Sequence, residues 1–114
     1  LDEAVRRAVR PVAELSERTG KSVIFTEVGY PAVRSAWIAP RDEGPGRPAG
    51  TEDAARASAA VARALAKESW WKGVYWWKAS SDGKPAAPGE RGYQILGTPA
   101  EKAIELGFRQ RAGS

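Results

Sequence analysis

The chain has 114 residues, a length that fits at most one domain. Its hydrophobic fraction of 42% and charged fraction of 28% are ordinary for a globular protein and exclude an intrinsically disordered chain. Cysteine and histidine are absent. This excludes disulfides, thiolate or imidazole metal sites, cysteine nucleophiles and a Ser-His-Asp triad. Carboxylates, lysine and tyrosine remain as the main catalytic groups.

The net charge of +4 raises the question of an anionic partner such as nucleic acid. The arginines of the first helical segment, however, alternate with acidic residues, and the sequence has no run of five or six basic residues. We therefore expect a solvated helix face and no nucleic-acid partner. No apolar run approaches the ~20 residues of a membrane-spanning helix, so we expect no membrane partner either.

The first helix is predicted over residues 1–19. Asp2 and Glu3 suit the positive N-terminal end of the helix dipole. Pro11 should kink or split the helix, and Gly20 should end it. Apolar residues at three- and four-residue steps form one stripe: Leu1, Val5, Ala8, Val9, Val12 and Leu15.

Residues 22–28 are predicted to form a strand. The run "VIF" at residues 23–25 is apolar at successive positions, which is typical of a parallel strand covered on both faces. Residues 29–50 follow as a loop rich in proline and glycine. Loops of this length in a compact domain are usually functional or mobile.

A second helix is predicted over residues 51–68. Thr51 should be its N-cap, and Glu52 and Asp53 should lie in its first turn. Its inner stripe consists of Ala54, Ser58, Val61 and Leu65.

The second strand is predicted over residues 73–79, "GVYWWKA", and the last helix over residues 98–108. Thr98 and Glu101 predict a capping box, with Pro99 at the first helical position, where proline is tolerated. One face of this helix carries Ala100, Ile104 and Phe108.

The order helix, strand, helix, strand, helix predicts an α/β fold with parallel βα units. Two parallel strands are too few for an independent sheet, because both of its edges would be open. The chain also opens on Leu1 inside a helical pattern, without a methionine. We therefore expect residues 1–114 to be an excised piece of a larger sheet.

The sequence places chemistry-bearing residues where a parallel sheet binds ligands, at the carboxyl ends of its strands. Glu27 lies at that end of the first strand and Trp77 at that end of the second. Because side chains alternate along a strand, Val23, Phe25 and Glu27 should share one face. If this face lines a barrel, Glu27 should lie where the barrel opens. A flat aromatic ring beside a carboxylate suits a sugar, and glycoside hydrolysis uses two carboxylates.

Three stretches, "VIFTEVGYPAV", "WWKGVYWWKASSD" and "GTPAEKAIELGF", resemble the C-terminal part of glycoside hydrolase family 113, and together they cover about residues 20–108. This family comprises β-mannanase-type enzymes of clan A with a (β/α)8 TIM barrel, whose catalytic glutamates end strands four and seven. The resemblance implies that residues 22–28 are strand seven and residues 73–79 strand eight. The sequence departs from the family pattern at "TPA", residues 98–100, where the family usually has "KPA", and strands one to six are absent.

The resemblance implies a fragment of a retaining glycoside hydrolase that acts on β-linked mannose-containing polysaccharide or oligosaccharide. Glu27 falls on the nucleophile, Trp77 on the tryptophan that floors the sugar site, and Tyr30 within the same motif near the nucleophile. The acid/base glutamate is missing, so the isolated chain should be inactive. No cofactor or metal is required, and the family favours an extracellular or periplasmic location.

The partners expected besides the sugar are the remaining barrel segments of the parent chain or, failing these, a second copy of the chain. The fragment should expose an aromatic face around Phe25, Tyr75 and Trp77 that the rest of a barrel would cover. Such a face would drive self-association.

Structural readings of the same residues stay open at this point. Glu27 could cap a loop or pair with an arginine, Trp77 could be core, and Tyr30 could pack in the loop or hydrogen-bond the nucleophile. Trp76 should pack on a helix, and Trp70 should close the second helix against the strand together with its neighbour Trp71. The chain could also be a non-catalytic carbohydrate-binding remnant, or an unrelated flavodoxin-type domain, which often carries a glycine-rich phosphate loop that is absent here.

Overall fold

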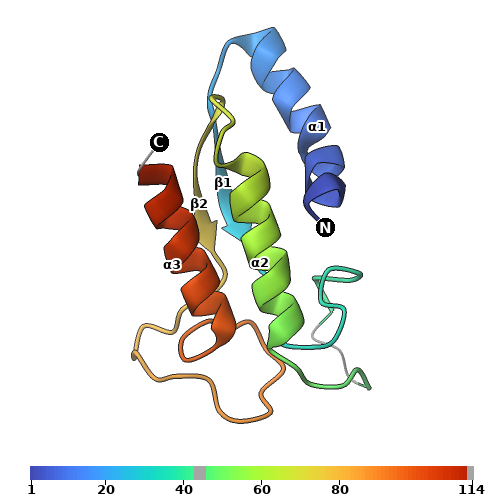
Figure 1. The fold of residues 1–114 in the computed structure, drawn as a ribbon, viewed down its shortest axis with the longest axis vertical. Coiled ribbons are helices and arrows are strands. Elements are labelled where there is room, and N and C mark those ends of the chain that lie inside the picture. Colours follow the sequence, from blue (N-terminus) through green and yellow to red (C-terminus); the bar gives the residue numbers. More distant parts are fainter. Residues whose placement is uncertain (43–45, 113–114) are drawn as a thin grey trace.

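The computed structural model describes residues 1–42 and 46–112 of the chain. Within these ranges three helices and two strands follow in the predicted order (Figure 1). They are α1 (Asp2–Thr19), β1 (Val23–Val28), α2 (Glu52–Leu65), β2 (Trp71–Trp76) and α3 (Pro99–Ala112). β1 and β2 pair in parallel, which confirms the predicted α/β class with parallel strands.

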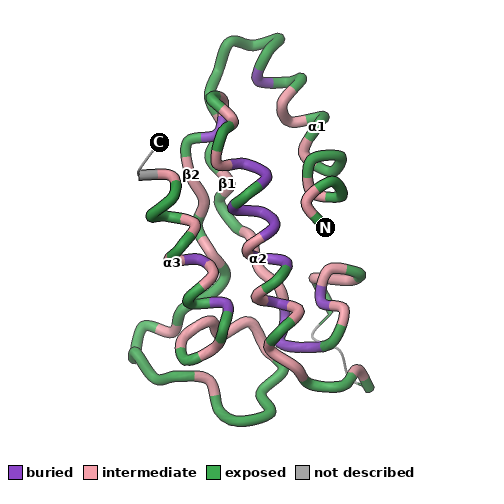
Figure 2. The backbone as a smooth tube through the Cα atoms, viewed as in Figure 1, coloured by how far each residue is buried: buried purple, intermediate pink, exposed green. Residues whose placement is uncertain are grey.

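The helices form one layer over one face of the two-stranded sheet, with α2 and α3 side by side and α1 beside α2 (Figure 1). Burial is concentrated on α2, as the purple segments of the tube show (Figure 2). The predicted inner stripe of α2 is buried throughout. Ser58 in this stripe donates its hydroxyl to the Ala54 carbonyl over 2.8 Å, so its polar atom is satisfied inside the core.

The hydrophobic core between α2 and the sheet is centred on Val61, Leu65 and Trp71. Burial of a side chain such as Leu65 contributes about 1.5–3 kcal/mol relative to its exposure. Half-buried neighbours from α1, from both strands and from the residues next to the strands complete the cluster: Val5, Val9, Phe25, Val28, Tyr30, Trp70, Val74 and Trp76. The predicted helix-packing roles of the tryptophans at 70, 71 and 76 are therefore confirmed.

The opposite face of the sheet is open. Ile24 is 55% exposed and Tyr75 70% exposed on this side. Phe25, which we expected to belong to the exposed aromatic face, instead packs against Trp70 and Trp71, with ring centroids 6.3 and 6.4 Å away. The open face therefore carries Ile24 in place of Phe25.

A bulge in β1 accounts for this difference. Phe25 and Val28 both pack on the helix side, although three positions separate them, while their partners on β2 are only two positions apart. The extra residue lies at 26–27, where both side chains are exposed. The prediction that Val23, Phe25 and Glu27 share one face is therefore wrong, because the bulge interrupts the alternation directly before Glu27.

β2 begins and ends earlier than the predicted range of 73–79. Pairing with β1 already begins at Trp71. The ladder ends at Trp76 because the next segment turns to another partner: the backbone N–H of Lys78 donates to the carbonyl of Tyr93 over 3.0 Å. Trp77 consequently lies one residue beyond the strand rather than within it.

The helix ends also differ from prediction. α2 ends at Leu65 rather than at residue 68, and α3 continues to Ala112 rather than ending at 108. α1 runs through Pro11 as one helix and is not split. Pro11 lies on an exposed face, where water can hydrate the carbonyl that the proline leaves without a donor. Gly20 ends α1 as predicted, in the left-handed conformation with φ 68°.

Neither of the two predicted N-cap residues, Thr51 and Thr98, makes the side-chain hydrogen bond expected of an N-cap. Thr51 makes no side-chain hydrogen bond to α2. At α3 the carboxylate of Glu101 accepts from the backbone N–H of Gly97, one residue before the position of a capping box. The hydroxyl of Thr98 instead donates to the carbonyl of Ile95 over 2.7 Å.

The long segment after β1, which the sequence predicts as a loop, packs against α2. Val33 and Ala36 are completely buried and form a second cluster with Ala54 of α2. The backbone N–H of Ser35 donates to the carboxylate of Asp53 over 2.7 Å, which ties the segment to the first turn of α2. Asp53 thus anchors the loop in addition to its expected place in the first helical turn.

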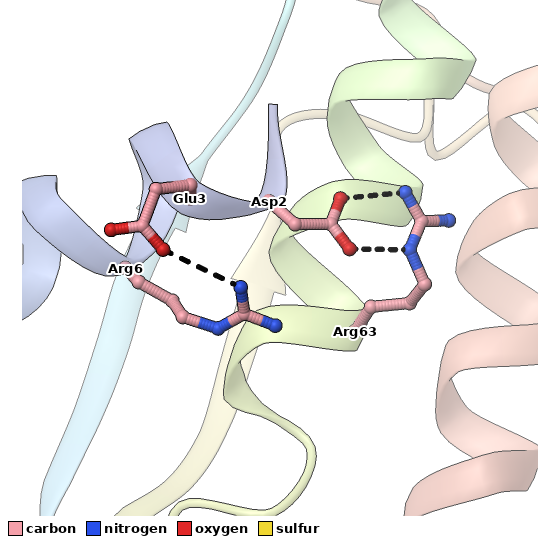
Figure 3. Close-up of polar contacts among 4 residues, drawn as sticks. All are labelled: Asp2, Glu3, Arg6 and Arg63. Atoms are coloured by element: carbon pink, nitrogen blue, oxygen red, sulfur yellow. Dashed lines mark hydrogen bonds and ion pairs between the residues drawn. The ribbon is translucent and has the colours of Figure 1, made fainter.

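α1 is held to α2 by a bidentate ion pair (Figure 3). Nε and Nη2 of Arg63 lie 2.9 and 2.8 Å from the Asp2 carboxylate oxygens. The apolar stripe of α1 is only partly buried, since Leu1 and Leu15 are 39% and 49% exposed. None of the described helices is long and apolar enough to span a lipid bilayer.

Substitution of Asp2 by Asn should loosen α1. The hydrogen bond from Arg63 lowers the pKa of the Asp2 carboxyl below its ordinary 3.8, so the pair stabilises the fold above that value and is lost as pH falls through the folded-state pKa. Both side chains are partly exposed, so we expect less than about 1 kcal/mol. Amide hydrogen exchange in α1 should accelerate near neutral pH, and the difference from wild type should disappear in acid.

Glu3→Gln is the matched control, because Glu3 and Arg6 form a 3.7 Å ion pair within α1 between side chains 66% and 53% exposed (Figure 3). Exchange in α1 should stay at the wild-type rate in this variant. Equal acceleration in both variants would mean that general helix electrostatics, and not the Asp2 link, hold α1.

Candidate functional site

The segments that follow β1 and β2 lie at the same end of the molecule (Figure 1). They enclose an open cleft of about 750 Å³. The cleft brings together the three site residues that the sequence predicts, Glu27, Tyr30 and Trp77. Its full lining is Glu27, Val28, Gly29, Tyr30, Pro40, Arg41, Trp77 and Tyr93.

Glu27 enters the cleft through the bulge at the end of β1. Its side chain is exposed, and no described residue forms a hydrogen bond or an ion pair with its carboxylate. The alternatives of a loop cap or an arginine partner are therefore not realised within the described residues. The carboxylate is available to a ligand in the cleft.

Trp77 is 44% exposed, so it is not a core residue. Its indole lines the cleft, and the ammonium group of Lys78 lies 5.3 Å from the ring centroid. Contacts of this kind contribute about 0.5–1 kcal/mol at exposed sites and restrict the ring. The ring presents a flat apolar surface in the same cleft as the Glu27 carboxylate.

A close backbone approach joins the two strand ends. The N–H of Trp77 donates to the carbonyl of Val28 over 2.7 Å. A Cβ atom at Gly29 would lie 2.5 Å from the Trp77 carbonyl oxygen and 3.1 Å from its Cβ. Only glycine fits at position 29 without moving Trp77, so the residue that follows "TEV" fixes how close the two halves of the site lie.

Tyr30 is half-buried and packs against both hydrophobic clusters. Burial raises the pKa of its phenol above the ordinary value of 10, so the hydroxyl is protonated at neutral pH and can act as a donor. No described residue accepts a hydrogen bond from this hydroxyl. The packing role is thus present, while the hydrogen bond to Glu27 is not.

Sequence reasoning missed three contributors to the cleft wall, Pro40, Arg41 and Tyr93. The Tyr93 hydroxyl donates to the carbonyl of Pro40 over 2.6 Å, across 53 positions of sequence. No local pattern predicts a contact of that range. The short alternation "YQI" at residues 93–95 was the available signal that this loop pairs with some neighbouring segment, but it does not identify that segment.

Glu27 is the only carboxylate among the described residues that line the cleft. Asp82 and Glu90 lie in exposed loop positions outside it. Glu43, the acid of the long loop after β1 that follows Asp42 in sequence, lies outside the described residues. Among the described residues the arrangement therefore offers one carboxylate without a protein partner, Glu27, and the aromatic platform of Trp77.

Solved structures that are similar to this chain show which class of protein its fold resembles. A β-mannanase of glycoside hydrolase family 113, AaManA from Alicyclobacillus acidocaldarius, in complex with ManMIm, matches with a TM-score of 0.81 and 27% identity over 96% of this chain. Two structures of family 113 β-1,4-mannanases match with TM-scores of 0.79 and 0.78 at 18% and 17% identity, over 95% and 92% of this chain, and so support the fold alone. This α/β unit is thus similar to part of a TIM-barrel enzyme.

The chain belongs to glycoside hydrolase family 113, since the family model matches residues 2–98. It spans 36% of the length of the Alicyclobacillus enzyme, and 36% and 35% of the other two mannanases in the order given above. No curated protein matches the chain. The family expected from the "TEVGY" and "YWWK" motifs is confirmed.

Gly29→Ala should disturb the cleft specifically. The added methyl group meets the Trp77 backbone at 2.5 Å, and overpacking of this kind typically costs about 1–3 kcal/mol. Thermal unfolding should shift downward, and the tryptophan emission should change as Trp77 moves. Gly92→Ala is the control, because a Cβ there meets nothing within 4 Å. Similar losses in both variants would contradict a specific role for the contact between residues 29 and 77.

Proposed function

We propose that this chain supplies one half of the catalytic centre of a retaining glycoside hydrolase that acts on β-linked mannan, with Glu27 as the nucleophile. One observation carries the proposal: an unpaired carboxylate at the end of a parallel strand lies in one cleft with a half-exposed tryptophan, in a family 113 chain. The similarity to the Alicyclobacillus β-mannanase supports mannan as the substrate class.

In this proposal β1 and β2 are strands seven and eight of a (β/α)8 barrel. The family's second catalytic glutamate ends strand seven, and Glu27 ends β1. Trp77 then forms the floor of the subsite beside the scissile bond, and Tyr30 lies near the nucleophile. The two strand ends are tied by the hydrogen bond between Val28 and Trp77, which suits a nucleophile and a platform that act on one sugar ring.

The proposed reaction has two steps. In the first, Glu27 attacks the anomeric carbon while a carboxylic acid from another barrel strand gives its proton to the glycosidic oxygen. The C–O bond breaks, the leaving sugar departs as an alcohol, and a glycosyl ester forms on Glu27. In the second, the other carboxylate takes a proton from water, the water oxygen attacks the anomeric carbon, and Glu27 is released. The two carboxyl groups must lie about 5–5.5 Å apart.

The test uses a barrel-length polypeptide that contains these residues, with β-mannan, β-glucan and xylan as substrates. Glu27→Ala should lower turnover of mannan by on the order of 10⁴-fold, the loss typical for a residue of the covalent machinery. Added azide should restore turnover and give a mannosyl azide of α configuration, because a small anion replaces the missing nucleophile on the same face. Glu90→Gln, an exposed acid outside the cleft, should keep wild-type activity.

The isolated 114-residue chain should turn over no mannan oligomer, since removal of an acid/base group alone forfeits about 10²–10⁴-fold. Turnover by the purified chain, abolished by Glu27→Gln, would assign the second carboxylate to this chain. The proposed division of the site between this chain and other barrel segments would then be wrong.

A second candidate function is binding without hydrolysis, with Trp77 as a platform. The exposed ring and the absence of a second described carboxylate in the cleft favour it. The two functions differ in one measurement on the barrel-length polypeptide. A binding module retains affinity for mannohexaose and releases no reducing sugar, whereas the hydrolase releases reducing sugar and loses that activity with Glu27→Ala.

We further propose that the remaining barrel segments cover the open sheet face. Ile24 and Tyr75 are more than half exposed there, and a two-stranded parallel sheet leaves backbone donors and acceptors free at both edges. Alone, the chain should self-associate through this face. Sedimentation should reveal oligomers that Tyr75→Lys weakens. A sharp monomer that unfolds cooperatively and binds no hydrophobic dye would indicate a self-sufficient domain instead.

A further inference from the structure

Part of the cleft lining comes from two loops without regular structure of their own. Pro40 and Arg41 lie in the long loop after β1, and Tyr93 lies in the loop after β2. The Tyr93 hydroxyl donates to the Pro40 carbonyl over 2.6 Å, in a partly buried position. This hydrogen bond joins the two loops at the rim of the cleft.

Tyr93 is itself fixed at its backbone. Its carbonyl accepts from the N–H of Lys78 over 3.0 Å, and the carbonyl of Lys78 accepts from the N–H of Ile95 over 2.9 Å. Lys78 directly follows the platform residue Trp77. Tyr93 therefore connects the backbone next to the platform with the backbone next to Arg41.

Arg41 has the chemistry of a substrate contact. Its side chain is exposed at the cleft, and no described residue forms a hydrogen bond or an ion pair with its guanidinium group. A guanidinium group presents five N–H donors in a planar fork, which suits the vicinal hydroxyl groups of a neutral sugar. An arginine exposed at a cleft with no partner among the described residues can donate to a ligand.

We propose that Tyr93 is a positioning residue that holds Arg41 at the rim of the cleft, and that Arg41 is a specificity-determining residue that binds hydroxyl groups of a mannan chain. The inference rests on the proposed function for the identity of the sugar. The link between the two loops does not depend on it, because it follows from the hydrogen bonds alone.

The first experiment tests the link without any sugar. In the barrel-length polypeptide, trypsin should cleave after Arg41 several-fold faster in Tyr93→Phe than in wild type. The variant lacks the hydroxyl that donates to the Pro40 carbonyl, so the segment around Pro40 is held less firmly. Ser80→Ala is the matched control: it removes one hydroxyl from the same loop, where Ser80 contacts Gln94 and not Pro40. Its cleavage rate should equal wild type. Equal rates in Tyr93→Phe and wild type would overturn the positioning role.

The second experiment tests the substrate contact with mannohexaose as the probe. Tyr93→Phe and Arg41→Ala should each raise KM, and the Kd of the probe, by about 3- to 10-fold, the effect typical of one hydrogen bond. Turnover at saturation should change by less than about 2-fold, because the contact forms equally in the ground and transition states. In the double variant the two effects should not add, since Tyr93 acts through Arg41.

Additive effects, or an unchanged KM in Arg41→Ala, would overturn the proposed contact. If Tyr93→Phe does not fold, Arg41→Ala still decides the contact, because Arg41 is exposed and supports no described residue. A polypeptide that neither hydrolyses nor binds any β-mannan refutes the proposed function and, with it, Arg41 as a mannan contact. The trypsin result then still decides whether Tyr93 positions the loop.

Discussion

The site depends on one close backbone contact, the approach of Trp77 to the end of β1. The Trp77 N–H reaches the Val28 carbonyl at 2.7 Å, and position 29 has no room for a side chain. Parallel pairing places the carboxyl ends of β1 and β2 at the same end of the sheet, but the segments that follow the strands could still diverge beyond the paired residues. The glycine lets the chain that leaves β1 run against the chain that leaves β2. A carboxylate and an aromatic ring that are 50 positions apart in sequence are thereby brought into one cleft.

The sequence predicted the helices and strands because their periods are local. The stripe of α2 is buried as predicted, whereas the apolar run of β1 forms the predicted strand but is covered on its helix side alone, since Ile24 is exposed. The exposure of Glu27 at the carboxyl end of β1 was also predictable, since a carboxylate that follows an apolar strand avoids burial where the strand ends. The bulge at 26–27 was not, because it depends on how β1 pairs with β2, and so the face of Phe25 was assigned incorrectly.

The wall of the cleft was beyond sequence reasoning for the same physical cause. The Tyr93–Pro40 hydrogen bond joins residues 53 positions apart, and nothing in either local pattern selects the partner. The end of β2 depended on another such contact, since Lys78 leaves the ladder to pair with Tyr93. Local propensity therefore located the elements, while long-range hydrogen bonds decided where β2 ends and what encloses the cleft.

The state of Glu27 sets a requirement on whatever covers the open sheet. The carboxylate is exposed and has no described partner, so water hydrates it in this chain. In the proposed barrel, a covering layer of strands would remove much of that water, and an ionised carboxylate loses several kcal/mol when it is buried without donors. Under that proposal the covering segments would have to bring hydrogen-bond donors to Glu27 as well as a second carboxyl group. The Tyr30 hydroxyl, protonated because burial raises its pKa, is a donor that already lines the same cleft as Glu27. In the proposed barrel, the packed tyrosine of this chain thereby becomes a candidate partner for Glu27.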